Sequence, residues 1–211
     1  MRSRTRIKIC GMTDGNDVRH AVDAGVDALG FIFVPDSPRY INPEPAREII
    51  SRLPPFVDAV GVFMNEEAAR VQEIVQYCGL TMLQLHGVET PEYCRQFQLR
   101  VVKAFQVHPE LSAENFKPYE DAVSAFLLDT YHKTRGGGTG QVFDWARLKE
   151  LQLAKPVILA GGIGPDNVVR AISEVRPFAV DVNSAVEKEP GRKSAELVTR
   201  LMAAVASCCQ V

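Results

Sequence analysis

Six reactive or charged side chains end short apolar runs of the sequence or follow such runs closely. They are Cys10, Arg39, His86, Asp129, Asp181 and Ser184. A thiol, an imidazole and carboxylates are groups that enzymes use to move protons, and a guanidinium pairs with carboxylate or phosphate. These residue types are those of a proton-transfer site for an anionic substrate, provided that the fold brings the ends of the runs together.

Each of these residues also has a purely structural interpretation. A lone cysteine in an apolar strand, such as Cys10, is usually a small buried hydrophobe, and His86 is more often structural than catalytic. Asp129 ends an all-apolar run, where a carboxylate needs a partner or a role, but it could cap the next element or pair with Arg135 or Lys133. Arg39 could be a solvated loop residue. The residue types alone leave both interpretations open.

Two later loops contain small residues that favour anion binding. Gly161 and Gly162 follow one apolar run, and Ser184 and Ala185 follow the next. Backbone N–H groups approach an anion closely in such loops, and parallel barrels often bind phosphate after their seventh and eighth strands. The loops therefore predict a phosphorylated substrate, with tight turns that bind nothing as the alternative.

The elements that must position these residues alternate along the chain. Strands are expected over residues 6–10, 28–34, 59–63, 82–86, 101–105, 125–129, 156–160 and 179–182. Helices are expected over residues 17–24, 66–78, 113–119, 145–151, 166–175 and 194–206, with two more beginning at Asn42-Pro43 and Thr90-Pro91. Eight strand–helix units predict an α/β protein, a single-domain (β/α)8 TIM barrel over residues 1–211, in which all strand ends share one mouth. An open doubly wound sheet is the alternative.

The composition limits the partners and the location of the protein. Lys and Arg number 24 against 26 Asp and Glu, and they are scattered, which argues against a nucleic-acid partner. No apolar run reaches the roughly 20 residues that span a bilayer, and the run after the basic start is too short for a signal peptide. The 5 cysteines match no zinc or redox spacing, as expected of free thiols in a reducing compartment. We therefore expect a cytoplasmic protein with no metal site and no membrane partner.

Seven short motifs, taken together and in order, resemble those of the phosphoribosylanthranilate isomerase family. They are Lys8-Ile9-Cys10-Gly11, Ser37-Pro38-Arg39-Tyr40-Ile41, Gln84-Leu85-His86-Gly87, Leu128-Asp129, Gly137-Gly138-Thr139-Gly140, Ala160-Gly161-Gly162-Ile163 and Asp181-Val182-Asn183-Ser184. Each motif is weak by itself. Jointly they are specific, and they cover the whole chain.

The resemblance implies a cofactor-free Amadori rearrangement in tryptophan biosynthesis. N-(5-phosphoribosyl)anthranilate would become 1-(2-carboxyphenylamino)-1-deoxyribulose 5-phosphate, with Asp129 as general acid and Cys10 as general base. Arg39 would hold the anthranilate carboxylate. His86 and Asp181 are further candidates for substrate binding whose roles stay open, and Asp181 could instead only organise its loop. The resemblance places the substrate phosphate on backbone amides near Gly138, Gly162, Ser184 and Ala185.

The protonation states of the two proton-transfer groups need adjustment by the site. The pKa of a free cysteine is about 8.5, so we expect a nearby positive charge, such as that of Lys8, to lower the pKa of Cys10. Two positions depart from the family pattern. Ala185 replaces a usual glycine and would strain its loop only at positive φ, and Ser194 replaces an acidic residue but can still cap the last helix.

Two other functions compete with this interpretation. The related aminoaldose isomerase of histidine biosynthesis resembles a two-aspartate design, so the thiol of Cys10 argues against it. A non-catalytic barrel that binds a phosphorylated ligand would be supported by loss of Cys10 or Asp129, and both are present. The last helix is ordinarily amphipathic, so a monomer and a homodimer both remain open.

Overall fold

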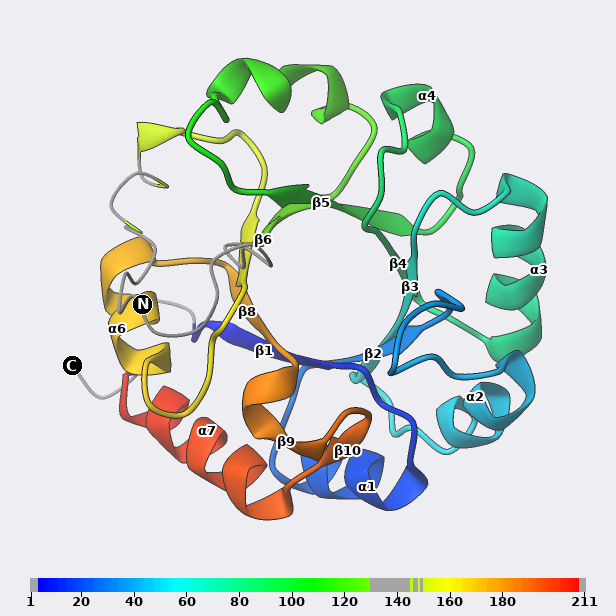
Figure 1. The fold of residues 1–211 in the computed structure, drawn as a ribbon, viewed down its shortest axis with the longest axis vertical. Helices are drawn as coiled ribbons and strands as arrows, with labels where there is room; N and C mark the ends of the chain where they lie inside the picture. The colour runs from blue at the N-terminus through cyan, green and yellow to red at the C-terminus, as the bar shows by residue number, and fades with distance from the viewer. Residues whose placement is uncertain (1–3, 130–144, 146–147, 149, 209–211) are drawn as a thin grey trace.

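The computed structural model describes residues 4–129, 145, 148 and 150–208, and its centre is a closed barrel of parallel strands ringed by helices (Figure 1). The barrel strands are β1 (Arg6–Cys10), β2 (Ala28–Ile32), β3 (Asp58–Phe63), β4 (Met82–Leu85), β5 (Arg100–Gln106), β6 (Ala125–Asp129), β7 (Val157–Ala160) and β8 (Ala179–Val182). Each strand pairs with the next, and β8 pairs with β1 to close the ring. The predicted (β/α)8 barrel is confirmed.

Side chains alternate along each strand between the barrel interior and the layer beneath the helices. Part of the barrel interior is apolar and is filled by small and branched residues, namely Val102, Ala104, Ala125, Leu127, Ile158, Ala160 and Ala179. Residues of the opposite parity, such as Ile9, Phe126 and Val180, pack outward in the main core with helix residues. This alternation directs Cys10 and Asp129 inward at the carboxyl ends of their strands.

The helices follow the expected pattern with shifted ends. They are α1 (Gly15–Asp23), α2 (Pro43–Ile50), α3 (Ala68–Cys78), α4 (Pro91–Cys94), α6 (Val168–Val175) and α7 (Ala195–Ser207). Ser194 caps α7 by accepting from the backbone N–H of Leu197, as expected of the serine at that position. Asn42 precedes α2 but makes no side-chain cap bond, because its Oδ1 accepts from the hydroxyl of Tyr40 instead.

Two segments differ from the sequence-based expectation. The segment expected as a helix over residues 113–119 forms two 3₁₀ turns, η1 (Ala113–Asn115) and η2 (Lys117–Tyr119). Pro118 lies in the second turn, and its missing N–H is compatible with a short turn rather than a regular helix. After β8 the chain forms an unexpected hairpin of β9 (Glu187–Glu189) and β10 (Arg192–Lys193). The helix expected over residues 145–151 falls largely outside the described residues.

None of the helices in the described ranges 4–129 and 150–208 has the length and apolar character needed to cross a membrane. The cysteines of these ranges, Cys10, Cys78, Cys94 and Cys208, all carry free thiols. The prediction of unpaired cysteines is therefore confirmed for these four positions.

Candidate active site

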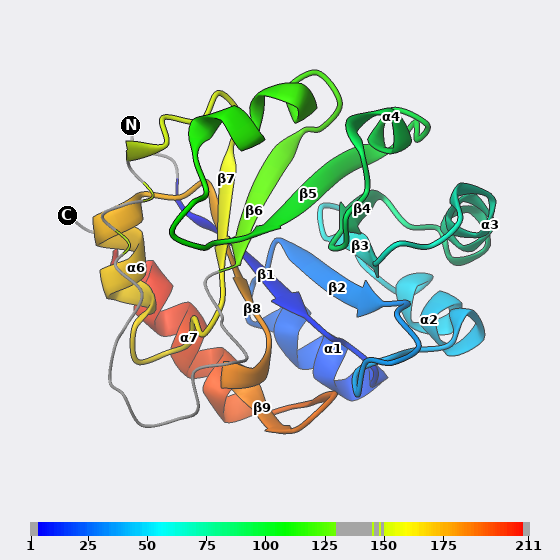
Figure 2. The same ribbon diagram turned by 45° about the horizontal axis from the view of Figure 1, so that its top comes forward.

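The candidate site lies at the carboxyl ends of the barrel strands, where inward-facing positions change from apolar to polar. Figure 2 shows the strands side by side, with the β9–β10 hairpin beside α1 and the loop that follows β1. Inward-facing polar side chains at this end include Lys8 and Cys10 of β1, Gln84 of β4, Asp129 of β6 and Asp181 of β8. Strands far apart in the sequence therefore contribute to one mouth.

Lys8, Cys10 and Asp181 form a buried polar group where the first and last strands meet. Lys8 Nζ donates to both carboxylate oxygens of Asp181 at 2.9 Å, and 7% of each side chain is exposed. Gly30 of β2 provides the space, because a Cβ there would lie 2.7 Å from Cys10 Sγ and 3.0 Å from Lys8 Nζ. The thiol therefore lies directly beside a buried ammonium–carboxylate pair.

The pKa of the Cys10 thiol is raised, so the expectation that its pKa is lowered was wrong. Burial is the largest cause, and it outweighs the lowering effect of the Lys8 ammonium. The pKa of Lys8 is raised as well, because Asp181 and Cys10 together outweigh burial, the largest single effect. Lys8 is therefore an ammonium ion and Cys10 a neutral thiol at neutral pH.

His86 and Asp129 approach each other from two strands separated by β5. His86 Nε2 lies 3.5 Å from Asp129 Oδ2, and the two side chains are 35% and 27% exposed. The amide nitrogen of Gln84 lies 3.1 Å from His86 Nδ1, and Gln84 is 2% exposed. The Gln84 amide nitrogen can donate to Nδ1 when that nitrogen carries no proton, and Nε2 is the ring nitrogen that faces Asp129. Arg135 and Lys133, the alternative partners of Asp129, lie outside the described residues.

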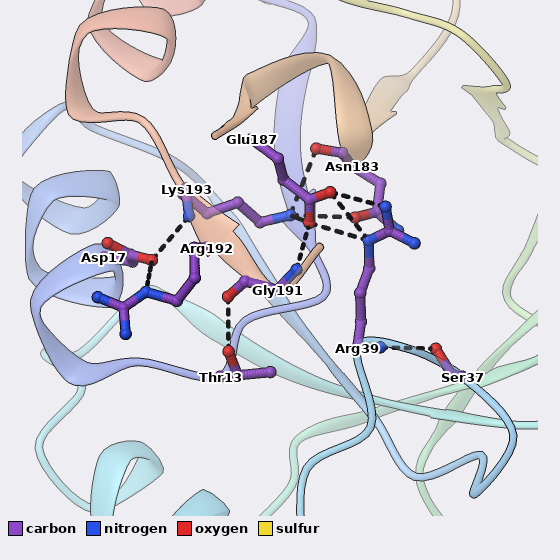
Figure 3. Close-up of polar contacts among 9 residues, drawn as sticks. All are labelled: Thr13, Asp17, Ser37, Arg39, Asn183, Glu187, Gly191, Arg192 and Lys193. Carbon is purple, nitrogen blue, oxygen red and sulfur yellow. Dashed lines mark hydrogen bonds and ion pairs between the residues drawn. The ribbon is translucent and has the colours of Figure 1, made fainter. Parts of the chain in front are cut away.

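Arg39 is held by an ion pair rather than solvated in its loop. Its Nε lies 2.9 and 3.0 Å from the two carboxylate oxygens of Glu187, and its Nη2 donates to Oε2 at 2.7 Å (Figure 3). Its side chain is 19% exposed, so the solvated-loop alternative is wrong. A Cβ at Gly11 would lie 2.8 Å from both Arg39 Cδ and Asn183 Oδ1. Gly11 therefore lets Arg39 pack against the turn that follows β1.

The loop after β7 has the backbone geometry that its glycines suggested. Gly161 and Gly162 have φ values of 90° and 69°, which side-chain-bearing residues rarely adopt. Asn167 closes the turn, because its Oδ1 accepts from Gly164 N–H and its Nδ2 donates to the Gly162 carbonyl, each at 2.9 Å. This leaves a compact loop of small residues at the mouth.

The loop after β8 meets the loop after β7. Ser184–Val186 form the 3₁₀ turn η3, in which Ser184 is exposed. A Cβ at Gly164 would lie 2.6 Å from the Cβ of Ala185, so the two loops are in contact. Ala185 does not have a positive φ, so alanine causes no backbone strain there. Gly138, the remaining residue expected near the phosphate, lies outside the described residues.

Sequence reasoning missed three side chains that complete the site. The inward parity of Gln84 in an otherwise apolar strand was the available signal, since buried amides require partners. Glu187 and Lys193 lie in a charged hairpin without hydrophobic periodicity, so no pattern in the sequence placed them near Arg39. Within the residues that the structure describes, no group of three or more His, Cys, Asp or Glu side chains is arranged to hold a metal ion.

Comparison with known proteins identifies the family. The family model described as N-(5'-phosphoribosyl)anthranilate (PRA) isomerase matches residues 7–204. The N-(5'-phosphoribosyl)anthranilate isomerase of Citrifermentans bemidjiense is 49% identical over 199 residues, which are 94% of this chain and 96% of the relative.

Solved structures agree in both fold and sequence. The phosphoribosyl anthranilate isomerase of Thermotoga maritima superposes with a TM-score of 0.88 and 40% identity, covering 96% of this chain and 99% of the other. Another isomerase structure, in complex with reduced 1-(o-carboxyphenylamino)-1-deoxyribulose 5-phosphate, has a TM-score of 0.86 and 39% identity, with coverages of 96% and 99%. The chain therefore belongs to the N-(5'-phosphoribosyl)anthranilate isomerase family.

Proposed function

We propose that the protein converts N-(5'-phosphoribosyl)anthranilate into 1-(2-carboxyphenylamino)-1-deoxyribulose 5-phosphate, an Amadori rearrangement of tryptophan biosynthesis. The observation that carries the proposal is the joint presentation of a thiol and a carboxyl group at one barrel mouth. Cys10 ends β1 and Asp129 ends β6, with β7 and β8 between them in the ring. An aldose–ketose isomerisation requires this pair, one group to donate a proton and one to remove a proton.

Asp129 is the general acid in this proposal. It protonates the ribose ring oxygen while the C1–O bond breaks, which leaves an iminium ion at C1. The Nε2–H of His86, 3.5 Å away, can donate to the C=O oxygen of the protonated carboxyl and so direct its O–H toward the sugar. His86 then orients the acid, and Gln84 keeps the ring proton on Nε2 through Nδ1.

Cys10 is the general base. It removes the proton from C2, the C–H electrons form the C1–C2 double bond, and the iminium nitrogen takes the displaced electron pair. The resulting enolamine tautomerises to the ketone. Burial raises the pKa of the thiol, so Cys10 first releases its S–H proton to solvent, and the ammonium of Lys8 stabilises the resulting thiolate, which is the base. Asp181 holds that ammonium in place.

The substrate carries two anionic groups, and each has a matching position. Arg39 binds the anthranilate carboxylate, since a guanidinium can pair with a carboxylate through two parallel bonds. The phosphate is bound at the two loops that are in contact after β7 and β8. Its backbone donors are proposed near the same residues that the resemblance implied, Gly138, Gly162, Ser184 and Ala185.

We further propose that residues 1–211 form one domain that acts in the cytoplasm as a monomer or a homodimer. The pairing of β1 with β8 supports one domain, because it joins early and late parts of the chain. The free thiols support a reducing compartment. The partner is a phosphorylated small molecule.

The experiment that tests the function follows anthranilate-type fluorescence after the protein meets freshly made substrate. Fluorescence should fall with the parent protein and persist with Cys10→Ala and Asp129→Asn. Cys78→Ala is the matched control, because Cys78 is a buried thiol of α3 whose Sγ–H donates to the Pro43 carbonyl. Full turnover by a folded Cys10→Ala protein would remove Cys10 from the mechanism, and no turnover by the folded parent would remove the isomerase assignment.

A further inference from the structure

Two charged residues of the β9–β10 hairpin are buried against Arg39, although the proposed proton transfers do not use them. The side chains of Glu187 and Lys193 are 4% and 1% exposed. Lys193 Nζ donates to Glu187 Oε1 at 2.7 Å, and the same carboxylate pairs with Arg39. Figure 3 shows the Glu187 carboxylate between the two cations. Burying these charges is costly unless they act together, so their arrangement calls for a role.

Glu187 occupies one particular edge of the guanidinium. It contacts Nε and Nη2, the edge beside the aliphatic part of Arg39. The end of the guanidinium, formed by Nη1 and Nη2, is the other edge that can bind a carboxylate through two parallel bonds. Nη1 has no hydrogen-bond acceptor among the residues that the structure describes. Arg39 is therefore fixed along one edge and able to donate from its end.

The charges of this cluster leave room for one more anion. Arg39 and Lys193 are cations and Glu187 is an anion, so the three side chains together carry one positive charge. Glu187 stays ionised: burial tends to raise its pKa, but the hydrogen bonds from Arg39 and Lys193 outweigh burial and lower it. A second carboxylate, bound at the Nη1–Nη2 end of Arg39, would make the cluster neutral.

The hairpin is anchored to the parts of the barrel that carry the reaction. Gly191 N–H donates to Glu187 Oε1 at 3.1 Å, and Thr13, after β1, donates to the Gly191 carbonyl at 2.6 Å. Lys193 Nζ also donates to the carbonyl and Oδ1 of Asn183 at 3.3 and 3.0 Å, directly before η3. The cluster thus connects the strand that carries Cys10 with the loop proposed for the phosphate.

We propose that Glu187 and Lys193 are positioning residues that set the specificity of Arg39 for a substrate carboxylate. Glu187 holds the Nε edge, which turns the Nη1–Nη2 end toward the aromatic acid of the substrate. Lys193 neutralises part of the Glu187 charge. Because Lys193 Nζ donates to both residues, it also fixes the distance between the Glu187 carboxylate and Asn183. The inference rests on the proposed function, since it takes the anthranilate carboxylate as the ligand of Arg39.

A different role for Glu187 makes the opposite prediction. If Glu187 were a stand-in that the substrate carboxylate must displace from Arg39, its removal would tighten binding of the substrate. If Glu187 positions Arg39, its removal weakens binding, and only for ligands that carry the carboxylate. The sign of the change therefore distinguishes positioning from competition, and a ligand without the carboxylate separates both from a general loss of structure.

The test measures Kd by titration calorimetry for two stable ligands. One is reduced 1-(2-carboxyphenylamino)-1-deoxyribulose 5-phosphate, and the other is the same compound without the carboxylate. The parent should bind the carboxylate ligand more tightly than the ligand without the carboxylate. Glu187→Gln should weaken binding of the carboxylate ligand about tenfold, because the charge-assisted contact with Arg39 is misaligned. The Kd of the ligand without the carboxylate should change by less than about twofold. Glu48→Gln, which breaks an exposed pair with Arg52, is the matched control and should change neither Kd.

Other variants keep the outcome decisive. Glu187→Asp retains the charge but is one methylene shorter, so it should show the same selective loss even if Glu187→Gln does not fold. Retention of the full carboxylate preference by either folded Glu187 variant, or tighter binding, overturns the inference. Arg39→Met tests the underlying function: if it keeps the preference, Arg39 does not bind the carboxylate and both proposals fall. If Arg39→Met loses the preference while the Glu187 variants keep it, only the positioning role fails.

Discussion

Replacing Lys8 with methionine removes the cation of the buried ion pair beside Cys10 while keeping much of the side-chain volume. Lys8 Nζ lies 2.9 Å from both oxygens of Asp181, and 7% of each side chain is exposed. The variant leaves Asp181 as an unpaired buried carboxylate, which costs about 3–5 kcal/mol. A typical domain is stable by roughly 5–15 kcal/mol, so the loss is a large share of the free energy of unfolding.

The same substitution should also suppress catalysis at neutral pH. Burial raises the pKa of Cys10, and the charge of Lys8 is the largest of the effects that lower it. Removal of Lys8 should therefore raise the pKa of the thiol further. Each unit of pKa corresponds to about 1.36 kcal/mol and to about tenfold less thiolate at a pH below the pKa. The rise of kcat/KM with pH should therefore move to higher pH, with a loss of at least about tenfold at pH near 7.

Urea unfolding measures the first effect, and the pH profile of the fluorescence assay measures the second. Arg52→Met is the matched control, because Arg52 pairs with Glu48 at 2.7 Å while both side chains are exposed, at 73% and 68%. The control should change the unfolding midpoint little and leave the profile in place. A Lys8→Met protein that matches the control in both measurements would refute the reasoning.

Three further predictions follow from described contacts. Gly30→Ala places a Cβ 2.7 Å from Cys10 Sγ, so kcat should fall sharply while circular dichroism shows the parent's secondary structure. Ser194→Ala removes the cap contact with Leu197 and should lower the free energy of unfolding by about 1 kcal/mol in urea titrations; an unchanged midpoint would contradict a capping role. Burial raises the pKa of Cys94 to about 11, whereas an unfolded thiol ionises near pH 8.5, at about its ordinary value. The unfolded state therefore loses its proton first, and stability should decline as the pH rises through this window, less steeply in Cys94→Ala.

Much of the site could be predicted because strand parity is readable from the sequence. β1, β6 and β8 begin and end at the expected residues, and a two-residue period then directs Cys10, Asp129 and Asp181 to one interior surface. The order of the strands also follows from simple rules, since strand–helix alternation produces parallel neighbours. Placement of polar residues at strand ends was therefore predictable before any contact was known.

What could not be predicted depends on packing in three dimensions. The net pKa shift of Cys10 is set by how completely the barrel excludes water from the thiol, and the residues next to Cys10 in the sequence do not reveal this degree of burial. The pairing of Glu187 with Arg39 joins positions 148 residues apart through a hairpin with no hydrophobic period. The segment with Pro118 was ambiguous for a different reason: local propensity does not separate a short helix from successive 3₁₀ turns.

The closure of β1 against β8 has a consequence for the order in which the protein is made. Lys8 and Asp181 are 173 positions apart, so one partner leaves the ribosome long before the other. Until β8 has been synthesised, Lys8 keeps its hydration, and the edge of β1 that β8 will occupy has no partner strand. Contacts of such long range form late and slowly. The environment of Cys10 is therefore assembled only near the end of synthesis. A nascent chain that stops before β8 contains the thiol but lacks the Lys8–Asp181 pair beside it.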